Sequence, residues 1–183
     1  AVAFTPDGRR AFVSNRQDDT VSVIDTATRK VTHTLKVGDE PHGLLTDAQG
    51  KFLYVLNTAS NDIYIYDAVT LQWVKKLSAG RSPWALALSP DGASILVTNT
   101  LSHITGLRQH LKSEVTVIDT ARAIVTDRIT VTDSNLITGV AWHPSGRYAL
   151  ATLNRTKNLV PMTRLMQGCT ITNGLAVLWP DGT

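Results

Sequence analysis

An internal repeat of 42 residues runs through this chain of 183 residues and constrains its fold more than any other feature. The period is marked by residues that recur at the same spacing: Gly8, Gly50 and Gly92, and Asn15, Asn57 and Asn99. Each unit reads as a short apolar strand, a turn such as Pro6-Asp7-Gly8, and three further strands, the last of them more polar. Four short strands in a unit of this length are typical of propeller blades. The repeat therefore predicts an all-β fold, a β-propeller.

Composition supports the same fold class. Val, Ile and Thr together account for 51 residues, whereas glutamate occurs only at Glu40 and Glu114. Because β-branched residues favour strands and glutamate favours helices, this balance indicates an all-β protein. With 43% hydrophobic residues and a net charge of +3, the chain is neither a disordered segment nor a strongly polyanion-seeking protein. It contains no apolar run long enough for a transmembrane segment.

Four repeat units are expected, at about residues 1–42, 43–84, 85–136 and 137–183. The third and fourth units are longer, with insertions at residues 100–114 and 155–168. Two interpretations of the last residues are open: Gly174–Trp179 is the third strand of the fourth unit, or Gly174–Thr183 opens a fifth. The first interpretation is favoured because it places both insertions in the loop between the second and third strands.

The second strands carry a family resemblance. Phe12-Val13-Ser14-Asn15 and its copies, together with the Pro-Asp-Gly turns, resemble the YVTN family of β-propeller repeats. The resemblance implies a periplasmic or cell-surface location in bacteria or archaea. It departs from the family pattern at residues 102–112 and 155–168.

Four blades rarely close a ring, and an open arc leaves unpaired strand edges at both ends. We therefore expect the chain to be part of a ring of about seven or eight blades. The remaining blades would come from sequence outside these residues or, in a less usual arrangement, from a second copy of the chain. The single cysteine, Cys169, excludes an internal disulfide.

One face of the propeller is the candidate functional face. In a blade, the loop after the second strand and the connection to the next blade lie on the same side, so both insertions and the inter-blade connections share it. Loops on a rigid scaffold commonly carry function. The candidate ligand- or partner-binding residues on this face are His42, Arg81, Trp84, His103, Arg108, His110, Arg155, Lys157 and Arg164.

The favoured functional hypothesis is a non-catalytic binding or scaffold propeller that holds a partner protein or a small ligand. The segment from Ser134 to Pro180 contains no Asp or Glu but four basic residues, so the ligand or partner could be anionic. Nucleic acid is disfavoured, because the basic residues are few and are not interleaved with aromatic ones.

The alternative is a cofactor-bearing or cytochrome-partnered propeller subunit of a periplasmic oxidoreductase, which the resemblance also allows. His42, His103 and His110 could then ligate haem or a metal, with Met162 or Met166 as a soft partner. No Cys-x-x-Cys-His haem attachment or catalytic motif occurs in the sequence, so it requires no cofactor and predicts no catalytic residue.

Overall fold

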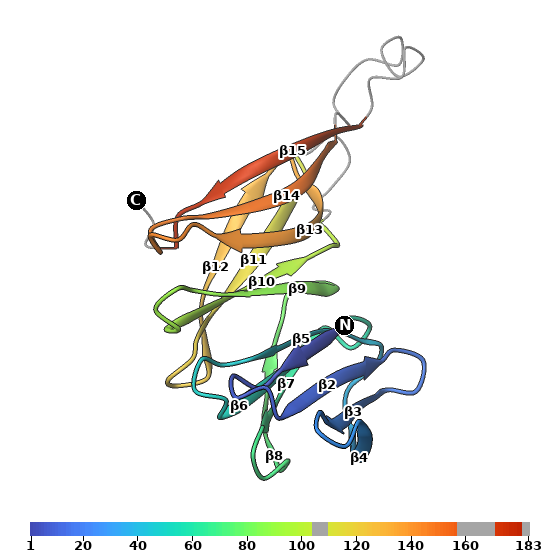
Figure 1. Ribbon diagram of the computed structural model, residues 1–183. Coiled ribbons are helices and arrows are strands. Elements are labelled where there is room, and N and C mark those ends of the chain that lie inside the picture. Colours follow the sequence, from blue (N-terminus) through green and yellow to red (C-terminus); the bar gives the residue numbers. More distant parts are fainter. Residues whose placement is uncertain (104–109, 157–170, 181–183) are drawn as a thin grey trace.

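The computed structural model describes residues 1–103, 110–156 and 171–180, and every regular element within them is a strand (Figure 1). Blade 1 contains β1 (Val2–Phe4), β2 (Arg10–Asn15), β3 (Thr20–Asp25) and β4 (Lys30–Lys36). Blade 2 contains β5 (Pro41–Thr46), β6 (Phe52–Asn57), β7 (Asp62–Asp67) and β8 (Trp73–Ser78). Blade 3 contains β9 (Pro83–Leu88), β10 (Ser94–Asn99), β11 (Lys112–Asp119) and β12 (Ile124–Thr132). Blade 4 contains β13 (Asn135–Trp142), β14 (Ala149–Thr156) and β15 (Ile171–Leu178).

All strand pairs are antiparallel and follow chain order within each sheet, which confirms the predicted all-β propeller architecture with four blades. The first strands of successive blades touch one another: β1 contacts β5, β5 contacts β9, and β9 contacts β13. These strands therefore line the inner side of the arc, and blades 1 and 4 stand at its opposite ends (Figure 1).

The last described strand settles the register of the fourth unit. β15 pairs antiparallel with β14 along its whole length, from Thr156–Ile171 to Ala149–Leu178. It is the third strand of blade 4, as the favoured interpretation predicted, and both insertions connect a second strand to a third. Their predicted bounds were partly wrong: residues 112–114 belong to β11, and residues 155 and 156 belong to β14. The reason is that ladder pairing continues into both insertions, as the Arg155–Thr172 and Lys112–Thr132 pairs show.

Three hydrophobic cores fill the spaces between neighbouring blades. The alternating side chains of one strand serve two of them: Leu53 and Val55 pack towards blade 1, whereas Tyr54 and Leu56 pack towards blade 3. The third core lies between blades 3 and 4 and includes Leu96. Strands buried on both faces read as nearly continuous apolar runs, which explains why β6 has little polar alternation.

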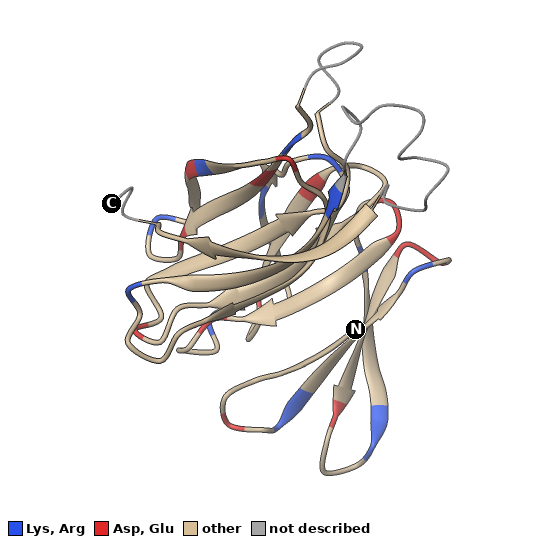
Figure 2. Cartoon of the chain, turned by 90° about the horizontal axis from the view of Figure 1, so that it is seen from above, with Lys and Arg blue, Asp and Glu red and all other residues tan. Residues whose placement is uncertain are grey.

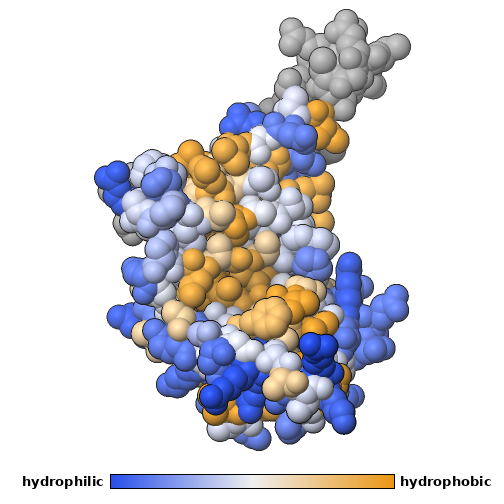
Figure 3. Space-filling model, viewed as in Figure 1, coloured by the Kyte–Doolittle hydropathy of each residue, from blue (hydrophilic) through white to orange (hydrophobic). Residues whose placement is uncertain are grey.

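The outer face of blade 4 repeats this apolar pattern, and within the described residues no blade packs against it. Phe12, Tyr54 and Leu96 occupy equivalent positions in blades 1 to 3 and are fully buried, whereas their counterpart Leu150 is 36% exposed. Leu175 and Val177 on β15 face the same way and are 56% and 49% exposed. Hydrophobic side chains, orange in Figure 3, accordingly gather over β15 and the strands beneath it. This face has the composition of a blade-to-blade interface.

Aspartates close the turns between third and fourth strands. The Asp25 carboxylate accepts hydrogen bonds from the backbone N–H of Thr28 (2.7 Å) and from its hydroxyl (2.9 Å). Asp67 likewise accepts from the N–H groups of Thr70 and Val69. In both cases the hydrogen bond from the threonine N–H is the main reason that the carboxyl pKa lies below its usual 3.8. The repeated aspartate therefore caps a turn.

Two alanine substitutions at equivalent positions test the packing between blades. We expect Leu96→Ala to lower the free energy of unfolding by about 2–5 kcal/mol, because it opens a cavity in a filled core. Leu150→Ala removes the same atoms from a partly exposed site and should cost less than about half as much. Urea unfolding of both variants measures the difference, and equal losses would contradict the assignment of the two faces.

The turn aspartates predict an acid-sensitive fold. The pKa of Asp67 is lower in the folded chain than its unfolded value of 3.8. Its contribution to stability is therefore present above that value and is lost as the pH falls through the lowered folded-state pKa. Asp67→Asn should reduce the loss of stability below about pH 4, measured as the urea midpoint against pH. Asp18→Asn is the control, because that carboxylate accepts no hydrogen bond within the described residues; if both variants behave alike, the prediction fails.

Candidate functional site

Each of the first two connections between blades contains a residue with a positive φ angle on the candidate face. Glu40 and Ser82, which precede Pro41 and Pro83, have φ values of 52° and 57°. Each is held by a side chain from the blade before it. The Asp19 carboxylate accepts from the Glu40 N–H at 2.9 Å, and the Asn61 amide oxygen accepts from the Ser82 N–H at 2.6 Å. These hydrogen bonds fix the point at which β5 and β9 begin, and with it the residues that follow each proline.

His42 and Trp84 follow those prolines and meet across the boundary between blades 2 and 3. Their rings stack with centroids 3.7 Å apart and an angle of 24° between planes. His42 Nδ1 lies 3.0 Å from the Trp84 carbonyl oxygen. Because a carbonyl can only accept, Nδ1 is the donor in this contact, so in the neutral form of the ring Nε2 carries the lone pair. No hydrogen bond to Nε2 occurs within the described ranges.

Blade 1 contributes to the same site. Ser14 Oγ donates to the His42 carbonyl oxygen at 3.1 Å. The guanidinium of Arg16 lies 5.9 Å from the centroid of the Trp84 ring and pairs with the Glu40 carboxylate, with Nη2 2.5 Å from Oε2. The His42 site therefore combines an imidazole, an indole face and a cation from three consecutive blades.

A second group of predicted residues meets where blade 2 connects to blade 3. Arg81 and His103 line a pocket of about 470 Å³ together with Glu114 and Arg128. Glu114 Oε1 lies 2.7 Å from Arg128 Nη1, and Glu114 Oε2 lies 3.4 Å from His103 Nε2. We call this the Arg81 pocket.

The remaining predicted residues join neither group. His110 is an exposed side chain that pairs with Asp133. Arg155 lies exposed on β14 in blade 4. Arg108, Lys157 and Arg164 lie outside the described residues.

Sequence reasoning missed Arg16, Glu114 and Arg128. One signal pointed to Glu114, since it is one of only two glutamates in the chain. Arg16 lies in a loop of ordinary length in the first unit, and Arg128 lies on a fourth strand. No sequence pattern therefore marks either residue as functional. Both side chains contact residues of a neighbouring blade: Arg16 pairs with Glu40 of blade 2, and Arg128 donates to the Ser78 carbonyl oxygen of the same blade.

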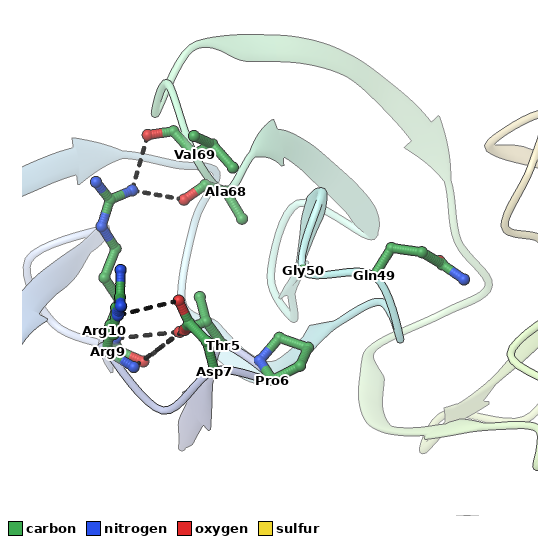
Figure 4. A pocket seen from close by; sticks show the side chains of 9 residues that line it. All are labelled: Thr5, Pro6, Asp7, Arg9, Arg10, Gln49, Gly50, Ala68 and Val69. Carbon is green, nitrogen blue, oxygen red and sulfur yellow. Dashed lines mark hydrogen bonds and ion pairs between the residues drawn. The ribbon is translucent and has the colours of Figure 1, made fainter.

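The opposite face holds a pocket of about 420 Å³ whose residues serve the fold (Figure 4). The Arg10 guanidinium donates to the carbonyl oxygens of Ala68 and Val69 at 2.8 and 2.7 Å, which ties blade 1 to blade 2. Thr5 and Asp7 hydrogen-bond each other within their own turn. These hydrogen bonds hold the turns of blades 1 and 2 together.

Two further features are absent from the described residues. No group of three or more His, Cys, Asp or Glu side chains could hold a metal ion within residues 1–103, 110–156 and 171–180. In the same ranges, no helix long and apolar enough to cross a membrane is found.

Comparison with known proteins gives the family. A family model described as the Cytochrome D1 heme domain matches residues 1–176. The chain belongs to this family. No curated protein matches the chain. The finer resemblance of the second strands to YVTN repeats stays a prediction.

Solved structures support the fold of this Cytochrome D1 heme domain member. A structure of Kuenenia stuttgartiensis hydrazine synthase is similar with a TM-score of 0.61 and 21% identity, over 98% of this chain and 62% of that one. A structure of the mitotic checkpoint complex is similar with a TM-score of 0.65 and 17% identity, over 82% of this chain and 46% of that one. The chain thus spans less than two thirds of either protein. At these identities the likeness concerns the propeller fold alone.

Removing the Asp19 carboxylate should loosen the connection that places His42. We expect Asp19→Ala to destabilise the protein by on the order of 1 kcal/mol, because the Glu40 N–H loses its partner. The Glu40 amide should also exchange its hydrogen several-fold faster, measured by NMR. Asp18→Ala is the matched control one residue away. Unchanged exchange at Glu40 would contradict the assigned role of Asp19.

Proposed function

We propose that this chain is part of a haem-bearing propeller of a periplasmic oxidoreductase, and that His42 on the inner strand β5 would be among the residues that hold the haem. The observation that carries the proposal is the match of residues 1–176 to the Cytochrome D1 heme domain. It supports the alternative hypothesis from the sequence better than the scaffold hypothesis. The likeness to YVTN repeats is compatible with it, since that resemblance also implies an exported propeller.

The donor set at the rim fits a haem. Histidines that ligate metals commonly donate their second ring N–H to a carboxylate or backbone carbonyl, which fixes the tautomer and the ring orientation. His42 already has this arrangement, with Nδ1–H on the Trp84 carbonyl and Nε2 carrying the lone pair. Bound there, a haem would supply an iron centre for electron transfer or for chemistry on a small ligand.

The chain's own residues would then prepare the site. The Trp84 carbonyl holds the His42 ring in one orientation, and the stacked indole limits its rotation and keeps water from one of its faces. Arg16 adds a positive charge beside Trp84, suited to acidic groups at the edge of a haem, although Glu40 offsets part of that charge. Of the three histidines considered as ligands, only His42 lies at the inner strands; His103 and His110 pair with carboxylates farther out.

Titration with haemin, followed by its absorption spectrum, tests the proposal. We expect the wild-type protein to bind haemin with the Soret band of histidine ligation, and His42→Ala to bind at least about tenfold more weakly and to lose that band. His103→Ala and His110→Ala are matched controls that should leave the spectrum unchanged.

Two results would count against the proposal. An unchanged spectrum in His42→Ala would exclude this residue as the ligand. Failure of the wild-type protein to bind haemin would favour the binding-scaffold hypothesis instead.

A further inference from the structure

The first two inter-blade junctions on the candidate face have similar backbone conformations but opposite charge. A pocket at the junction of blades 1 and 2 is lined by Asp19, Asp39 and Glu40 together with one cation, Arg16. At the next junction, one repeat later, Arg81 replaces Asp39 and Ser82 replaces Glu40. Figure 2 shows that the charged residues lie mostly near strand ends and in connections, where such differences do not disturb the cores.

The salt bridge between the third and fourth strands also differs between blades 2 and 3. In blade 2, Asp62 lies 3.7 Å from Lys76 and accepts hydrogen bonds from Asn57 and Ser60, so its carboxylate is engaged within its own blade. In blade 3 the equivalent pair is Glu114 and Arg128, and the longer side chain reaches towards the connection from blade 2. A Cβ added to Gly80 would lie 2.3 Å from Glu114 Oε1, so the glycine makes room for it.

Both guanidinium groups of the Arg81 pocket are anchored to the backbone. Arg81 Nη1 donates to the Ser102 carbonyl oxygen at 3.0 Å, and Arg128 Nη2 donates to the Ser78 carbonyl oxygen at 3.0 Å. A guanidinium has five N–H donors. In the described chain Arg81 uses one of them and Arg128 uses two, so both retain donors for a ligand. Anchoring also lowers the entropy lost on binding.

We propose that the Arg81 pocket binds a small oxyanion, held by Arg81 and Arg128. Two guanidinium groups face a single carboxylate, Glu114, and paired guanidinium donors match the geometry of carboxylate and phosphate groups. His103 lies at the rim and adds a third donor when protonated. The volume of about 470 Å³ has room for an organic anion around the charged group. The site is separate from His42 and does not depend on a haem.

Calorimetric titration with sodium sulfate tests the proposal, and malonate distinguishes carboxylate from tetrahedral oxyanion recognition. We expect saturable binding by the wild-type protein and a loss of about tenfold in affinity in Arg81→Gln. Arg128→Gln should show a similar loss, and circular dichroism verifies that each variant is folded. Arg122→Gln is the matched control, because Arg122 pairs with Asp119 at the opposite end of β11.

One further substitution tests whether the Glu114 carboxylate opposes the binding of an anion in the pocket. Glu114→Gln keeps an oxygen that can accept from Arg128 but removes the negative charge, so sulfate should bind several-fold more tightly. Weaker binding in Glu114→Gln would overturn the proposal, as would equal affinity in Arg81→Gln and the wild-type protein or the absence of saturable binding. None of these outcomes depends on haemin, so the failure of this proposal and of the proposed function are distinguishable.

Discussion

Face-to-face packing of one blade on the next is the interaction on which the rest of this structure depends. Each internal strand supplies side chains to two cores, as Leu53 and Tyr54 do on opposite faces of β6. Since the apolar contacts are made between the middles of the strands, the strand ends are free to carry polar residues. The candidate face is therefore built from positions that the cores do not constrain. The same blade structure can then carry different polar and charged side chains at successive junctions.

The repeat made the blades predictable because each feature of the unit has a local physical cause. The turn aspartates cap backbone N–H groups, and Gly8 and its copies adopt the positive φ that their turns require. Asparagines at the ends of second strands also act locally: Asn15 donates to Thr20, and Asn57 donates to Asp62. These interactions span a few residues, so a single unit contains the information needed to recognise them.

The candidate site was less predictable because its contacts cross blade boundaries. His42 and Trp84 were identified from their place in the repeat, but their stacking depends on how far one blade is rotated relative to the next. Arg128 and Glu114 belong to one hairpin, yet they matter because Arg81 and Gly80 of the preceding connection approach them. The extension of β14 through Arg155 arises from pairing with residues beyond the insertion, which no local pattern encodes.

The position of His42 in the repeat array has a consequence for how the site can open. In an array of repeats, each unit is stabilised by its neighbours. The His42 ring stacks on Trp84 of blade 3, and the His42 carbonyl oxygen accepts from Ser14 of blade 1. Blade 2 therefore cannot separate from either neighbour without breaking a contact of the site. Local opening at His42 then requires that a whole blade-to-blade interface opens.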